Sequence, residues 1–129
     1  MSIIDDIAQH LHNQGIGTLG TNLFKSSFPD DVAQTFIIGV FDTGGVAPDT
    51  YLPIDNPTFQ VSVKSTTYTV GQSKLEAIKN ALHQTANSDL GVSNSSYYYY
   101  IHAQSNGGHI GKTPLGWDEF SINFICKKR

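Results

Sequence analysis

The segment best suited to chemistry is Asp42-Thr43-Gly44, which directly follows the apolar run Ile37-Ile38-Gly39-Val40-Phe41. A carboxylate on a tight glycine turn at a strand end is half of the site used by aspartic proteases, in which two carboxylates share one proton. A dimer could bring two Asp42 side chains together, and Leu115-Gly116-Trp117-Asp118 is a passable match to the second signature of such enzymes. The sequence therefore admits one enzymatic alternative, a dimeric aspartic protease that uses Asp42.

Two features of the chain oppose this alternative. Retropepsin-like folds are nearly all β, whereas this sequence predicts two helices, and Pro48, Pro53 and Pro57 follow where a strand would have to resume. The simpler interpretation is a structural turn, in which Asp42 bonds its own backbone and Gly44 adopts a positive φ. We therefore predict a protein that is not an enzyme and binds no cofactor.

A second segment, Gly107-Gly108-His109-Ile110-Gly111-Lys112-Thr113, ends like a phosphate-binding loop. Asn106 stands where the first glycine of that motif is required, and Pro114-Leu115-Gly116 follows where a helix must begin. Without the N–H groups of a helix start, the phosphate site is lost. We interpret this segment as a mobile hairpin connection in which Lys112 is solvated.

Metal and thiol chemistry are not predicted either. Of the five histidines, His10 and His12 are two apart on a predicted helix and diverge, while the others show no paired ligand spacing. The single cysteine, Cys126, cannot form an internal disulfide. It lies in an apolar alternating run, so we expect a buried thiol in a reducing compartment.

Length and composition predict one domain spanning residues 1–129. Charged residues make up only 15% of the chain, against about 25% in typical domains, so polar uncharged side chains must cover much of the surface. Such a surface suits permanent contact with other proteins, and the net charge of −3 argues against nucleic-acid binding. The acidic N-terminus and the lack of an apolar run of roughly 20 residues predict a protein made in the cytoplasm with no membrane partner.

Hydrophobic periodicity predicts two amphipathic helices. The first follows a possible Ser2 cap and ends at Asn13-Gln14-Gly15, and the second covers about residues 69–84. Either Thr69 with Gln72 or Ser73 with Glu76 could cap the second helix. Its apolar stripe is expected to pack on the alternating strand after Pro57, giving the core residues Phe59, Val61, Val63, Leu75, Ile78 and Leu82.

Strands are predicted at residues 23–25, 35–41, 58–64, 97–104 and 120–126, with a polar loop at 87–96 and a glycine-rich connection at 105–118. The fold class is α+β: a mixed, mainly antiparallel four- to five-stranded sheet with two helices packed on one face. Alternation places Tyr97 and Tyr99 on the core face with Ile101. Tyr98 and Tyr100 then share the other face with His102, where a protein interface is plausible.

The excursion, residues 42–57, is too long for an ordinary turn and, with its three prolines, too stiff for a disordered linker. We expect it to project from the sheet and to contact another protein. Tyr51 and Leu52 would be its apolar anchors, while Asp49 and Asp55 would hold its shape or pair with basic partners. Asp42, at its start, is also a candidate interface residue.

Residues 39–63 and 115–124 resemble a family of phage minor capsid proteins grouped with siphophage tail terminators. Two features depart from the family pattern: Trp117 stands where a basic residue is expected, and residues 87–96 form a polar insertion. The motifs that carry the resemblance are Asp42-Thr43-Gly44-Gly45, Pro48-Asp49, Leu52-Pro53-Ile54-Asp55, Pro57-Thr58, Gln60-Val61, Val63, Leu115-Gly116, Asp118-Glu119 and Ser121-Ile122-Asn123-Phe124.

The resemblance implies a structural protein of the virion, located at the head–tail interface. Its members are expected to form a ring, here a homo-hexamer, that caps the finished tail tube and joins it to the head connector or stopper protein. DNA would pass through the lumen without sequence recognition. The ring itself is implied by the resemblance alone.

Overall fold

The computed structural model describes residues 3–25, 36–44, 57–83, 85–88, 98–104, 107–112 and 116–128. Among these residues no helix is long and apolar enough to cross a bilayer. The elements, in chain order, are α1 (Ile3–Asn13), β1 (Leu23–Lys25), β2 (Phe36–Asp42), β3 (Thr58–Ser65), α2 (Tyr68–Leu82), β4 (Thr85–Ser88), β5 (Tyr98–Ala103), β6 (Gly108–Lys112) and β7 (Asp118–Lys128).

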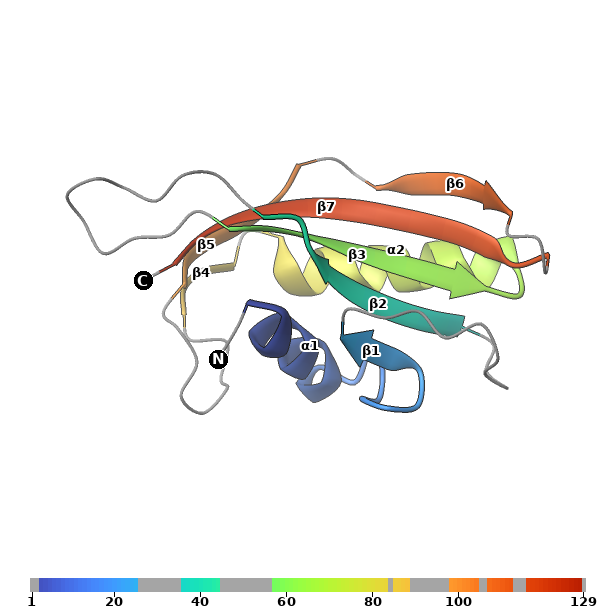
Figure 1. Cartoon of the computed structure of the whole chain (residues 1–129), viewed down its shortest axis with the longest axis horizontal. Helices are drawn as coiled ribbons and strands as arrows, with labels where there is room; N and C mark the ends of the chain where they lie inside the picture. Colours follow the sequence, from blue (N-terminus) through green and yellow to red (C-terminus); the bar gives the residue numbers. More distant parts are fainter. Residues whose placement is uncertain are drawn as a thin grey trace.

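The strands form one open sheet in the order β1-β2-β3-β7-β5-β4, with β6 also paired to β7 (Figure 1). Only β1 and β2 run parallel, so the sheet is mixed and mainly antiparallel, as predicted. The described residues contain seven strands instead of the four to five expected. β4 and β6 are the additional ones, because both fall in polar or glycine-rich segments that were interpreted as connections.

Strand β7 is the longest and serves as partner to three others. One of its edges pairs with β3 over residues 118–125. The other edge pairs with β6 over residues 118–121 and with β5 over residues 124–128. β5 and β6 therefore lie end to end along β7, so the segment predicted to be a mobile connection contains a strand.

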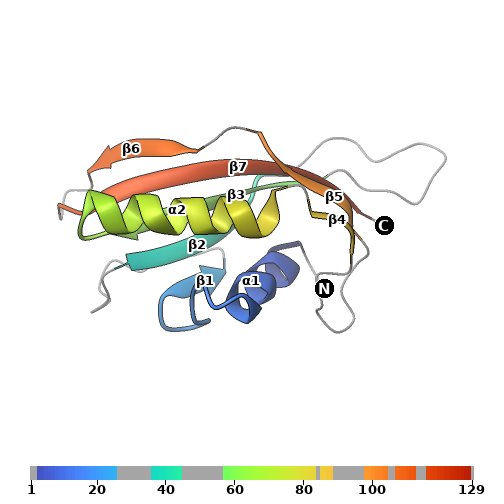
Figure 2. The same cartoon turned by 180° about the vertical axis from the view of Figure 1, so that it is seen from behind.

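Both helices pack on the same face of the sheet, as predicted, and Figure 2 views the molecule from that side. α1 lies against β1 and β2, while α2 lies across β3, β7 and β5. The predicted core is confirmed, because these six side chains are at most 1% exposed and belong to one cluster: Phe59, Val61, Val63, Leu75, Ile78 and Leu82.

The start of α2 differs from both predicted capping arrangements. The N-cap is Thr67, whose Oγ1 accepts a hydrogen bond from the Val70 amide at 3.3 Å. Helix and strand then approach closely at Gly71, where a Cβ would overlap the ring of Phe120 and the Ser65 hydroxyl. The helix begins at Tyr68, after a two-residue connection from the end of β3 at Ser65.

Candidate assembly interface

The β2–β3 hairpin fixes where the excursion leaves the sheet. Asp42 is paired with Phe59 at the end of the ladder. One step further, the Thr43 amide donates to the Thr58 carbonyl at 3.2 Å, and the two threonine hydroxyls lie 2.6 Å apart. The excursion therefore starts and ends at a hydrogen-bonded base.

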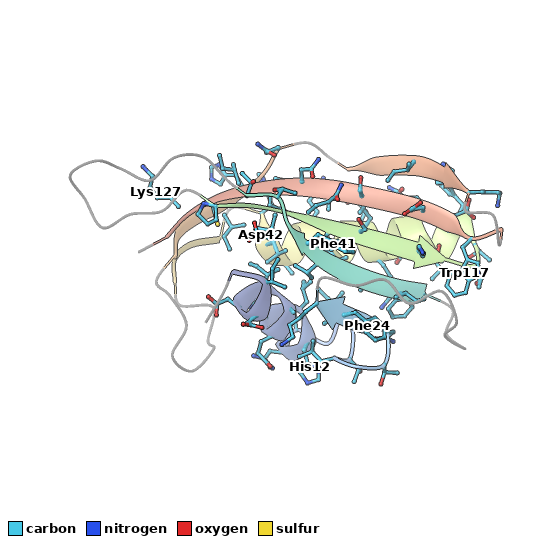
Figure 3. All side chains as sticks on the ribbon, viewed as in Figure 1. His12, Phe24, Phe41, Asp42, Trp117 and Lys127 are labelled. Carbon is cyan, nitrogen blue, oxygen red and sulfur yellow. The ribbon has the colours of Figure 1, made fainter. Side chains whose placement is uncertain are left out.

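Asp42 belongs to a turn at this base. The Gly44 amide donates to the Asp42 Oδ1 at 2.7 Å, and Gly44 has a φ of 95°. A side-chain bond to the backbone two residues later, followed by a left-handed glycine, is the arrangement predicted from the sequence. Figure 3 labels Asp42 at this end of β2, where its side chain is exposed.

The other end of the excursion is tied to β7 through Pro57. The Pro57 carbonyl accepts a hydrogen bond from the Cys126 amide at 3.0 Å, and the Cys126 Sγ lies 3.5 Å from the same oxygen. Cys126 is fully buried, which confirms the prediction of a buried thiol. The chain thus re-enters the sheet at a fixed point.

The structure describes only part of the predicted interface. Asp49, Tyr51, Leu52 and Asp55 lie outside the residues that the structure describes. Tyr98 and Tyr100 lie on β5, and their side chains also lie outside that description. Their roles as contact residues stay predictions.

The backbone nevertheless brings the two halves of the predicted interface together. Cys126 holds Pro57 and is paired with Ile101, and the next residue, Lys127, is paired with Tyr100. The excursion base and β5 therefore flank the C-terminal end of β7, at one end of the molecule (Figure 1).

The backbone pairing of β5 with β7 is irregular at the tyrosines. β5 advances from Tyr98 to Tyr100 while β7 advances only from Lys128 to Lys127. Such an irregularity inserts an extra residue and re-aims the side chains around it. The sequence alone contained no sign of it.

A polar cluster that sequence analysis missed lies at the opposite end of β7. His109 Nε2 lies 3.0 Å from Asp118 Oδ1, and Lys112 Nζ lies 3.3 Å from the same oxygen. Lys112 is therefore ion-paired, although its side chain is exposed, and the prediction of a merely solvated lysine is wrong. The hydrogen bond from His109 lowers the pKa of Asp118 below its usual value; burial opposes this effect and Lys112 adds to it.

Aromatic contacts fasten this cluster to the start of α2. The Tyr68 ring lies 5.3 Å from the His109 ring and 5.4 Å from the Phe120 ring. The cluster depends on the pairing of Lys112 with Asp118, so only recognition of β6 as a strand could have revealed it. Trp117 lies at the same end (Figure 3). Across the part of the chain that the structure describes, no three histidine, cysteine or acidic side chains could hold a metal ion.

The mixed, mainly antiparallel sheet with both helices on one face defines a small α+β protein. The family model for the bacteriophage tail terminator protein matches residues 10–129. The chain therefore belongs to the bacteriophage tail terminator family and is a structural protein of the virion tail.

Among solved structures, one chain of a structure titled "Virion of native gene transfer agent (GTA) particle" has a TM-score of 0.73. It is 13% identical and the alignment covers 98% of this chain and 94% of that one, so this likeness concerns the fold. A search of the curated proteins found no match.

Proposed function

We propose that the protein assembles into a ring, a homo-hexamer, that caps the tail tube and joins it to the head connector or stopper. DNA passes through the lumen of this ring without sequence recognition. Family membership supports this role. The polar, weakly charged composition, with 15% charged residues, supports permanent contact with protein partners.

The observation that carries the proposal is the double anchoring of the excursion. Asp42 and Thr43 fix its start, and Pro57 and Thr58 fix its end. A loop whose two ends are held by a rigid sheet presents its contact residues at lower entropic cost than a free loop does. This supports a role for the excursion in assembly.

Within the excursion, Tyr51 and Leu52 are proposed to bury apolar surface against the neighbouring subunit or the tail tube. Asp49 and Asp55 are proposed to hold the shape of the segment or to pair with basic partners. Tyr98 and Tyr100 on β5 extend the same surface, since the backbone places β5 beside the excursion base. Tyrosine supplies a large contact area at low entropic cost in such surfaces.

The proposal is tested by the double variant Tyr51→Ser, Leu52→Ser. We expect its thermal unfolding to match that of the unsubstituted protein, while ring formation and capping of purified tail tubes are lost. Analytical ultracentrifugation measures the ring, and negative-stain imaging counts capped tubes.

A matched control removes one aromatic and one aliphatic side chain elsewhere on the surface. Tyr68 and Ile110 are 53% and 61% exposed, so the variant Tyr68→Ser, Ile110→Ser makes the same chemical change, and its thermal unfolding is measured alongside because the Tyr68 ring also contacts His109 and Phe120. We expect this control to assemble. The assignment fails if the excursion variant assembles or unfolds, or if both variants lose assembly equally.

A further inference from the structure

Three of the five histidines meet at the C-terminal end of α2. His83 is the C-cap residue of the helix, and its ring lies 5.6 Å from the ring of His102. His10 on α1 places its Nε2 3.3 Å from the Ala81 carbonyl oxygen. The Nδ1 of His83 lies 2.9 Å from the Ala103 backbone nitrogen, so imidazole rings link this helix end to both α1 and β5.

The bond between Ala103 and His83 determines which ring nitrogen carries the proton. A backbone amide can only donate, so the Nδ1 of His83 must accept with its lone pair. The neutral ring then holds its proton on Nε2. The geometry is therefore compatible with a neutral His83 and incompatible with a doubly protonated one.

This bond also completes an edge of the sheet. The Gln104 amide donates to Asn123 on β7, so the Ala103 amide, one residue earlier, points toward the opposite edge. At that edge β4 begins with Thr85, which is paired with Ile101. The His83 side chain thus occupies the place that a backbone acceptor would have if β4 started two residues earlier.

Protonation acts on the two helix contacts in opposite directions. A proton on the Nδ1 of His83 removes the acceptor for the Ala103 amide, and it places a charged ring beside the ring of His102. His10 donates from Nε2 to a carbonyl, and its protonated ring still does so, in a position where the helix end favours a cation. Acid should weaken the contact of α2 with β5 and spare its contact with α1.

The other charged groups around His83, within the part of the chain that the structure describes, come from α2 itself. The His83 amide donates to the Lys79 carbonyl at 2.8 Å, which places Lys79 one turn before the ring. The Lys79 ammonium lies 3.9 Å from a Glu76 carboxylate oxygen. His102 on β5 and His10 on α1 are the titratable groups that the neighbouring elements bring to this helix end.

We propose that His83 is a proton-operated latch: a proton on its Nδ1 removes the acceptor of the Ala103 amide and so breaks this hydrogen bond between the end of α2 and β5. β5 carries Tyr98 and Tyr100, so loss of this hydrogen bond loosens part of the proposed assembly surface. This consequence for assembly rests on the proposed function, whereas the latch itself does not.

Hydrogen exchange of the Ala103 amide, measured by NMR on the full chain, tests the latch. We expect its protection, corrected for the intrinsic pH dependence, to fall about tenfold from pH 7.5 to 5.5, as loss of one hydrogen bond implies. Amides of the β3–β7 ladder should keep their protection. His83→Asn retains an acceptor that cannot gain a proton, so its Ala103 protection should not change with pH. The matched variant His102→Asn should still lose protection in acid.

Constant protection of Ala103 down to pH 5.5, or an acid loss that persists in His83→Asn, overturns the latch. The ring nitrogen shifts of His83 in the unsubstituted protein give an independent test: we expect the Nε2–H tautomer at pH 7.5, and the Nδ1–H tautomer would overturn it.

Tube capping measured at pH 7.5 and at pH 5.5 distinguishes failure of the proposed function from failure of the His83 latch. Absence of capping at both overturns the proposed function and leaves the latch standing. Equal capping at both, with loss of Ala103 protection, overturns the regulatory link.

Discussion

Asp42 has the residue type and the local sequence of a catalytic carboxylate, but its surroundings assign it to a turn. Its Oδ1 accepts the Gly44 amide at 2.7 Å, beside the paired threonines that close the hairpin. A short motif with this composition has little specificity, because turn formation and catalysis select the same residues. The structural use of Asp42 is enough to account for the motif.

We expect neither the unsubstituted protein nor the Asp42→Asn variant to cleave peptides. Stability should fall by about 1 kcal/mol, because a neutral amide is a weaker acceptor in the turn. Urea unfolding measures the stability, and a peptide library with pepstatin tests for cleavage. Pepstatin-sensitive cleavage that disappears in Asp42→Asn would revive the protease alternative.

Asp118 offers a second test at the same scale. Its folded-state pKa is lowered, chiefly by the His109 hydrogen bond, so its ionised form stabilises the fold above the unfolded-state pKa. That contribution is lost as the pH falls through the folded-state value. We expect Asp118→Asn to melt at a lower temperature than the unsubstituted protein at pH 7, with the gap closing below about pH 4.

The control for this prediction is Glu119→Gln, which removes the same charge one residue further along β7 and on the opposite side of the strand. Its melting difference should be smaller at pH 7. An Asp118→Asn gap that persists unchanged in strong acid would show that the carboxylate charge is not its cause.

Among the elements, α2 contributes the most sharply testable packing. Ile78 lies midway along its buried face and is fully covered by the sheet. Ile78→Ala should lower the free energy of unfolding by about 2 to 5 kcal/mol, because the cavity adds to the lost burial. Asn80→Ala on the exposed face of the same helix should change it by less than about 0.5 kcal/mol. Equal effects in urea melts would mean that the helix face is wrong.

The elements that sequence analysis located are those with strong local patterns. Both helices have apolar stripes, and β3 alternates from Phe59 to Val63, so their burial follows from residue spacing. β4 and β6 have no such pattern, and GHIGK in β6 is mostly exposed. Their strand conformation depends on pairing with β5 and β7, which no local window contains.

In the candidate site too, contacts within a short segment were predictable from the sequence, whereas contacts between separate elements were not. The Asp42 turn was predictable because its bond spans only two residues. The contacts of Cys126 with Pro57, of Lys112 with Asp118 and of His83 with Ala103 join separate elements, so they require the sheet register. The irregularity at Tyr98–Tyr100 belongs to the same class.

At the scale of the whole molecule, one apolar cluster links both helices to β1, β2, β3, β5 and β7. It includes Leu11 of α1, Val61 of β3, Ile78 of α2, Ile101 of β5 and Phe124 of β7. A core shared by helices and sheet favours unfolding in a single step. That residues 1–129 form one domain stays a prediction, which unfolding experiments can test.

We therefore expect one cooperative transition in urea. Far-UV circular dichroism reports the helices and sheet, while the fluorescence of Trp117, the single tryptophan, reports the turn before β7. The two curves should have the same midpoint and slope. A fluorescence change that precedes the loss of helix would instead identify the β6–β7 end as a separate unit.

The length of β7 has a mechanical consequence for the proposed role of joining the tail tube to the head connector. One continuous strand runs from the Asp118 cluster to the Cys126 anchor, a span of about 27 Å. A load applied at either end passes along covalent bonds. To slide β7 out, such a load must shear the β3–β7, β5–β7 and β6–β7 ladders together, since all three bind the same strand. β7 would thus carry a pulling force along the length of the subunit, and the excursion is bonded to one of its ends.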